Sequence, residues 1–173
     1  SMIEQPMLIG GQTAQASNGA TFERRNPLDG SVATRAPAAT AADAVRAVEA
    51  AQAAFPAWAA LGPTQRRQML MKASQALAAK ADAFAAAMAA ETGASGIWAG
   101  FNVHLSANML LEAAALTTQI NGQVIPSDVP GSMAMAVRQP AGVVLGIAPW
   151  NAPVILATRA IATPLACGNT VIL

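Results

Sequence analysis

The chain has 173 residues, 54% of them hydrophobic, with ten basic side chains, nine acidic ones and a formal charge of +1 at pH 7. One cysteine and one histidine exclude a disulfide framework and a zinc site that needs several such ligands, and the balanced charge argues against nucleic-acid binding. The length suits one domain or part of a larger one. Because alanine supplies much of the hydrophobic fraction and fills little volume, we expect the core to draw on large side chains from elsewhere.

The first 37 residues predict short strands. Residues 7–37 contain two turn signals, Gly10-Gly11 and the stretch NPLDG from Asn26 to Gly30, between runs of strand-like composition. We interpret this segment as a β-meander. The first residues carry no basic stretch followed by an apolar run, so we expect no secretory leader and a cytoplasmic location.

Three helices are expected next. Thr40, with Asp43 three residues later, resembles a capping box for a helix that ends before Pro56. A second helix is predicted from Pro63 to Gly93, and a third over residues 97–120. Their apolar stripes predict buried packing.

The last fifty residues predict two β units. Short extended pieces over residues 124–140 predict an exposed hairpin, whose expected use is pairing with another chain. After it, an aliphatic run at 142–148, a segment of helical length at 153–166 and a second β-type run at 169–173 form a β-α-β unit. This pattern predicts an α/β fold with an incomplete doubly wound, Rossmann-like sheet, which binds ligands beyond the carboxyl ends of its strands. Prolines and Arg159 interrupt the apolar stretch too often for a membrane span.

Asn151 lies at that predicted edge, within APWNAPVILATRA. An asparagine directly before a helix is commonly an N-cap, which is the plain structural interpretation. The surrounding residues favour a further role. APWNAP, followed by a helix and then PLACGNTVIL, resembles the aldehyde dehydrogenase superfamily. Further landmarks stand in the family's order: ERRNPLDG, the Ala51–Trp58 segment, QRRQMLMKASQAL, Glu91-Thr92-Gly93 and RQPAGVV.

The resemblance implies NAD-dependent oxidation of an aldehyde, with NADP also possible, through a thiohemiacetal and a thioester on a cysteine. Asn151 would then be the catalytic residue that donates a hydrogen bond to the oxyanion. Family cofactor contacts map to Ile147, Ala148, Pro149, Trp150 and Asn151, although Trp150 could equally be a core anchor. Cys167 lies at the end of the predicted helix and is expected to be a buried structural thiol. His104 is expected to be a surface or hydrogen-bonded histidine.

The resemblance also indicates the substrate. Ala152, Leu156 and Arg159 share one face of the predicted helix, and in the family this face lines the aldehyde tunnel. Their identities are most similar to the salicylaldehyde, vanillin and benzaldehyde dehydrogenase branch. Arg159 could meet a ring hydroxyl, or it could be a solvated or ion-paired helix residue; Phe101 and Leu105 match tunnel positions more loosely and could be ordinary core.

We therefore expect residues 1–123 and 141–173 to form the N-terminal part of a cofactor-binding domain, and residues 124–140 to be an oligomerisation hairpin in a dimer or tetramer. The catalytic domain, with the family's cysteine and glutamate, would lie outside the sequence, and no metal site is expected. Two alternatives stay open: an acylating or aliphatic semialdehyde member of the family, and a non-catalytic α/β binding module.

Overall fold

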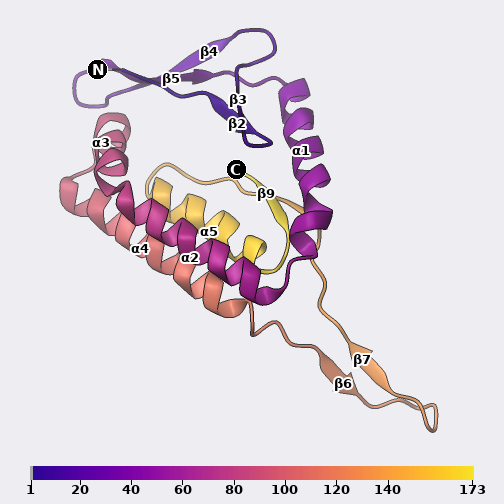
Figure 1. The fold of residues 1–173 in the computed structure, drawn as a ribbon. Helices are drawn as coiled ribbons and strands as arrows, with labels where there is room; N and C mark the ends of the chain where they lie inside the picture. The colour runs from indigo at the N-terminus through magenta and orange to yellow at the C-terminus, as the bar shows by residue number, and fades with distance from the viewer. Residues whose placement is uncertain (1) are drawn as a thin grey trace.

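The computed structural model describes residues 2–173 and shows an α/β chain in which the short amino-terminal strands face a group of helices and the last strand lies between them (Figure 1). In chain order, the elements before the hairpin are β1 (Ile3–Glu4), β2 (Met7–Ile9), β3 (Gln12–Ala14), β4 (Thr21–Arg25), β5 (Val32–Pro37), α1 (Ala41–Ala59), α2 (Pro63–Ala79), α3 (Ala81–Thr92) and α4 (Gly96–Leu116). The remainder consists of β6 (Gln123–Ile125), β7 (Ala134–Ala136), β8 (Val143–Leu145), α5 (Pro153–Ala166) and β9 (Thr170–Ile172).

The predicted meander is wrong as a single unit. β2 and β3 form their own hairpin around Gly10 and Gly11, whereas β4 and β5 pair in another sheet, whose third strand, β1, runs parallel to β5. The NPLDG turn is confirmed between β4 and β5. There Asn26 Oδ1 accepts a hydrogen bond from the backbone of Leu28, and Gly30 has a φ of 74°, which favours glycine.

The capping box on α1 is confirmed. The Thr40 side chain accepts from the backbone of Asp43, and the Asp43 carboxylate accepts from the backbone of Thr40. The predicted end before Pro56 is wrong, since α1 continues to Ala59. A proline near the end of a helix removes one hydrogen bond but keeps a helical φ, so the last turn can still form.

The second predicted helix is two helices. α2 ends at Ala79 and α3 begins at Ala81, with Lys80 at φ −101° and ψ 17° between them. Neither proline nor glycine marks this break, so local sequence did not predict it. The bend lets α2 pack against α4 and α5, while α3 packs against α4 and reaches β4 and β5. The third predicted helix is confirmed as α4, although it ends at Leu116 rather than near Ile120.

The two C-terminal β units match the predictions in type. β6 and β7 pair antiparallel and project from the body as an arm (Figure 1). β8 and β9 pair parallel in register, Val143 with Thr170, and α5 connects them as the crossover. This is the β-α-β unit of a doubly wound fold. Both strands are shorter than predicted, at three residues each.

Alanine lets the helices approach closely. One buried cluster joins α2, α4 and α5 and consists of Leu70, Leu110, Ala113, Ala114, Ala162 and Ala166. Small side chains on α4 and α5 allow their backbones to pack near one another, and the two helices make one of the most extensive contacts in the chain. α5, which begins beside Asn151, is therefore held on a rigid helical layer.

Candidate functional site

The candidate site is the turn between β8 and α5. Beyond β8, the backbone N–H of Gly146 still donates to the carbonyl of Ile172, at 2.8 Å, so the chain leaves the sheet only after this residue. A Cβ at Gly146 would lie 2.8 Å from the Cβ of Ala160, so glycine permits the close approach of α5 to the strand. Residues 147–152 consequently emerge at the carboxyl edge, where doubly wound sheets bind ligands.

Asn151 is not the N-cap of α5. That position belongs to Ala152, at φ −137° and ψ 66°, and no side chain of the cap residue bonds to the helix. The Asn151 side chain is exposed and forms no hydrogen bond with any group in residues 2–173. The plain structural interpretation of this asparagine is thus wrong, and a carboxamide with free donors stands at the edge of the sheet.

Two side chains from α4 hold the backbone of this turn. Trp98 Nε1 donates to the carbonyl oxygen of Asn151, at 3.2 Å. Asn102 Oδ1 accepts from the backbone N–H of Ile155, at 3.4 Å, in the first turn of α5. Neither residue was predicted from the sequence. The signal that could have found them is their spacing of four, which places a tryptophan and an asparagine on one face of a helix rich in apolar residues.

The predicted cofactor residues are only partly brought together. Ala148, Pro149 and Trp150 line a cavity of about 560 Å³ between the turn, α3 and one face of α5. Its floor is largely apolar, including Phe84, Met88, Val154 and Ile161. Ile147 is 84% exposed and lines no part of this cavity, and neither does Asn151. Trp150 is 65% exposed, so it is no core anchor within residues 2–173.

The predicted substrate residues do not line that cavity. Ala152 is buried, Leu156 and Leu105 are half-buried, and Arg159 and Phe101 are exposed. Phe101 stacks on Trp98, with ring centroids 5.6 Å apart and an interplanar angle of 20°. Because Trp98 also contacts the backbone carbonyl of Asn151, this aromatic pair lies beside the Asn151 backbone. Arg159 forms no ion pair within the described chain.

The two other candidate groups have simple roles. Cys167 is the C-cap of α5 and is only half-buried. The prediction of a buried thiol is therefore only partly correct. His104 is exposed on α4, with its Nε2 3.2 Å from Asn108 Nδ2, as expected of a surface or hydrogen-bonded histidine.

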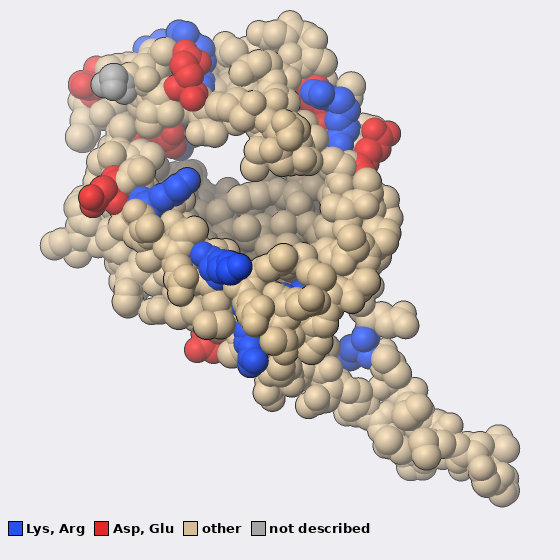
Figure 2. All heavy atoms as spheres, viewed as in Figure 1, with Lys and Arg blue, Asp and Glu red and all other residues tan. Residues whose placement is uncertain are grey.

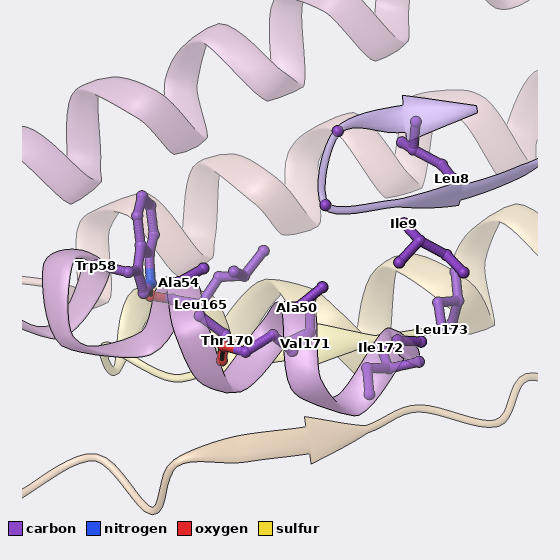
Figure 3. A pocket seen from close by; sticks show the side chains of 14 residues that line it. Leu8, Ile9, Ala50, Ala54, Trp58, Leu165, Thr170, Val171, Ile172 and Leu173 are labelled. Atoms are coloured by element: carbon purple, nitrogen blue, oxygen red, sulfur yellow. Dashed lines mark hydrogen bonds between the residues drawn. The ribbon is translucent and has the colours of Figure 1, made fainter. Parts of the chain in front are cut away.

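A larger hollow of about 670 Å³ lies among α1, the β2–β3 turn, the end of α5 and β9 (Figure 3). Apart from the Trp58 indole N–H and the Thr170 hydroxyl its lining side chains are apolar, and both polar groups are already used: they donate to the carbonyls of Leu165 and Ala51. No titratable side chain lines it. This hollow is therefore a packing surface rather than a site for chemistry.

Charge is sparse around the candidate site. On the face shown in Figure 2, Lys, Arg, Asp and Glu lie apart from one another, most of them near the edge. Two charged residues, Arg24 and Glu91, line the cavity beside the turn. The most perturbed carboxyl lies elsewhere. The backbone N–H of Thr40 and the Arg46 guanidinium hold the pKa of Asp43 well below its ordinary value.

A metal-binding cluster and a membrane-spanning helix are both absent from the described part of the chain. Within residues 2–173, no cluster of three or more His, Cys, Asp or Glu side chains could hold a metal ion. In the same range, none of the helices has both the length and the apolar character to cross a bilayer.

A parallel β-α-β unit with a free carboxamide at its carboxyl edge defines an α/β protein of the doubly wound class. Comparison with known proteins makes this specific. The profile of the aldehyde dehydrogenase family matches residues 14–173. The chain belongs to this family.

Individual relatives agree. The chain is 66% identical over 172 residues to a vanillin dehydrogenase of Pseudomonas fluorescens, covering 99% of this chain and 36% of the relative. It is 47% identical to a salicylaldehyde dehydrogenase of Pseudomonas putida over 170 residues, covering 98% and 35%. The crystal structure of a salicylaldehyde dehydrogenase from Pseudomonas putida G7, complexed with salicylaldehyde, superposes with a TM-score of 0.94 at 45% identity, covering 99% and 35%. The chain thus spans about a third of the length of the relatives it matches.

Proposed function

We propose that the chain is part of an NAD(P)-dependent dehydrogenase that oxidises an aromatic aldehyde to its carboxylic acid, with Asn151 as oxyanion donor. One observation carries the proposal: the Asn151 carboxamide is exposed and unpartnered within residues 2–173, at the carboxyl edge of two parallel strands, while α4 anchors its backbone. An N-cap asparagine would use its side chain within the helix, whereas this carboxamide is available to a ligand.

The chemistry needs such a donor. When a cysteine thiolate attacks an aldehyde carbonyl, negative charge develops on the oxygen, and a preorganised neutral N–H stabilises it without a proton transfer. Cys167 does not fit the nucleophile, because it caps the far end of α5 from Asn151. The nucleophile and the general base would come from outside these 173 residues.

The cavity beside the turn fits a flat cofactor ring. Ala148, Pro149 and Trp150 form an uncharged part of its wall, and the apolar floor would exclude water from a bound nicotinamide. Arg24 and Glu91 are the charged residues in the lining. NAD(P), when bound, supplies the acceptor for the hydride. Ile147 and Asn151 do not line this cavity. They complete the predicted contacts only if the cofactor also covers the exposed side of the turn.

Two observations support an aromatic substrate. The exposed Trp98–Phe101 pair beside Asn151 offers a surface on which an aryl ring can stack. The vanillin and salicylaldehyde dehydrogenases that resemble the chain act, by their names, on aromatic aldehydes. Leu156 and Leu105 extend this wall in our proposal, Ala152 leaves it room, and Arg159, free of any ion pair within residues 2–173, meets a ring hydroxyl.

The β6–β7 arm is proposed to join subunits in a dimer or tetramer. Its large apolar side chains are exposed, among them Val124 at 73%, Met133 at 75% and Val137 at 72%. An apolar two-stranded ribbon gains stability by pairing with a second chain. A cytoplasmic location stays a prediction.

The test is Asn151→Ala in the full-length enzyme. Removing one oxyanion donor lowers kcat about 10²- to 10³-fold, while the Kd for NAD should change far less. Asn108→Ala is the matched control, because Asn108 is an exposed asparagine on α4 whose side chain, within residues 2–173, hydrogen-bonds only to His104. Equal turnover by the wild type and Asn151→Ala would refute the proposed role.

A further inference from the structure

Asn102 is a buried side chain that has so far been given no role in the reaction. Asn102 lies on α4 and its side chain is fully buried, at 0% exposure. Its carboxamide is used at both ends. Nδ2 donates to the carbonyl of Trp98, one turn earlier, at 3.1 Å, and Oδ1 accepts from the backbone N–H of Ile155 at 3.4 Å.

α5 needs this contact because it lacks a cap of its own. Its N-cap residue, Ala152, has no side-chain acceptor, and Pro153 has no N–H. The free N–H groups of the first turn must find partners elsewhere. Asn102 supplies one acceptor from a neighbouring helix. Its side-chain oxygen replaces the acceptor that an N-cap side chain normally provides.

The same turn of α4 holds the residue before the helix. Trp98 Nε1 donates to the carbonyl of Asn151, and Asn102 Nδ2 binds the carbonyl of that same Trp98. Asn102 therefore contacts α5 directly and supports the residue that fixes the Asn151 backbone. Since the Asn151 side chain has no hydrogen bond within residues 2–173, its direction depends on this backbone.

We propose that Asn102 is a positioning residue for the oxyanion donor: it caps α5 from α4 and, with Trp98, fixes the backbone on which the Asn151 carboxamide is aimed. The proposal rests on the proposed function of Asn151. A displacement of a reacting group by about 1 Å can cost about 10²-fold in rate, so a buried residue without substrate contact can still change the chemical step.

Two substitutions separate its parts. Asn102→Leu keeps the branched skeleton, with larger methyl groups, and removes both hydrogen bonds. Asn102→Asp keeps an acceptor for Ile155; as a carboxylate it loses the donor to Trp98, whereas the neutral acid that burial favours can retain it. We expect single-turnover NADH formation with benzaldehyde to fall about 10- to 100-fold in Asn102→Leu and less in Asn102→Asp. KM for NAD should change little in either.

Ser106→Ala is the matched control. Ser106 lies one turn further along α4, is equally buried, and its Oγ has no hydrogen-bond partner within residues 2–173. Its substitution changes a buried position on the same helix without removing any hydrogen bond to the Asn151 turn. Single-turnover rates of Ser106→Ala should match the wild type.

The decisive experiment is a double-mutant cycle with Asn151→Ala in the full-length enzyme. If Asn102 acts through Asn151, Asn102→Leu should lower the rate by less than about twofold once Asn151 is alanine. Should the effects of the two substitutions multiply, Asn102 is only structural and the inference is overturned. If Asn151→Ala itself leaves the rate unchanged, the proposed function fails first. Should Asn102→Leu not fold, the same cycle with the smaller Asn102→Ala, which also removes both hydrogen bonds, decides: a loss that disappears in the Asn151→Ala background supports the proposal, and no loss or a multiplying one overturns it.

Discussion

Trp98 has two separable contacts, and substitutions can remove them one at a time. Its indole N–H donates to the Asn151 carbonyl at 3.2 Å, and its ring stacks on Phe101 at 5.6 Å between centroids. Trp98→Phe loses the hydrogen bond but keeps an aromatic ring. Trp98→Ala loses both.

The sizes of the two effects follow from these contacts. A partly exposed hydrogen bond contributes about 0.5–1.5 kcal/mol, which corresponds to about a 2- to 12-fold change in kcat/KM. This loss concerns the Asn151 backbone, so Trp98→Phe should affect every aldehyde by the same factor. An aromatic contact contributes about a further 0.5–1.5 kcal/mol. Only a substrate with an aromatic ring can lose this contribution.

The assay is kcat/KM from NADH absorbance, with benzaldehyde and propanal as a matched pair. We expect Trp98→Phe to lower kcat/KM equally for both aldehydes. Trp98→Ala should lower kcat/KM for benzaldehyde by a further factor of about 2 to 12. Trp58→Phe is the control, because it loses a comparable indole hydrogen bond at the opposite end of α5, to the carbonyl of Leu165. It should lower stability without changing the ratio between the two aldehydes.

Two results would refute the reasoning. If Trp98→Ala reduces kcat/KM for propanal as much as for benzaldehyde, the Trp98–Phe101 pair does not bind the ring. If Trp98→Phe matches the wild type, the hydrogen bond to Asn151 contributes nothing to catalysis.

Three further outcomes are expected of the full-length protein. Arg159→Leu should raise KM for hydroxylated benzaldehydes well above its effect on benzaldehyde, because Arg159 has no ion pair within residues 2–173 to occupy it. Gly146→Ala should cost about 1–3 kcal/mol in the free energy of unfolding, since the new methyl would lie 2.8 Å from Ala160 Cβ. Asp43→Asn should lower Tm at pH 7, but the difference from the wild type should shrink as pH falls below about 4, because the native pKa of Asp43 lies below its unfolded value of about 3.9.

Each of these has a contrary result. An equal rise of KM for benzaldehyde and its hydroxylated derivatives would place Arg159 outside the substrate site. A Gly146→Ala variant as stable as the wild type would show that α5 can move away from β8 without cost. If the Tm difference between wild type and Asp43→Asn were the same at pH 7 and pH 3, the ionised Asp43 carboxylate would not be the group that stabilises α1.

Local signals predicted the elements whose cause is local. The Thr40–Asp43 capping box, the NPLDG turn and the β-α-β order rest on hydrogen bonds and backbone preferences within a few residues, and the structure confirms all three. The break at Lys80 has no such cause. It lets both helices pack against α4 while α2 also contacts α5 and α3 also contacts β4 and β5.

The candidate site divides in the same way. The sequence by itself determined that a carboxamide would stand at the carboxyl end of a parallel strand, because strand, asparagine and helix follow one another directly. Only the tertiary structure decided whether that carboxamide is used as a helix cap. It is free because Asn102 and Trp98, about fifty residues earlier, supply the contacts that hold the α5 turn. Such contacts depend on how two helices pack, and no local preference records them.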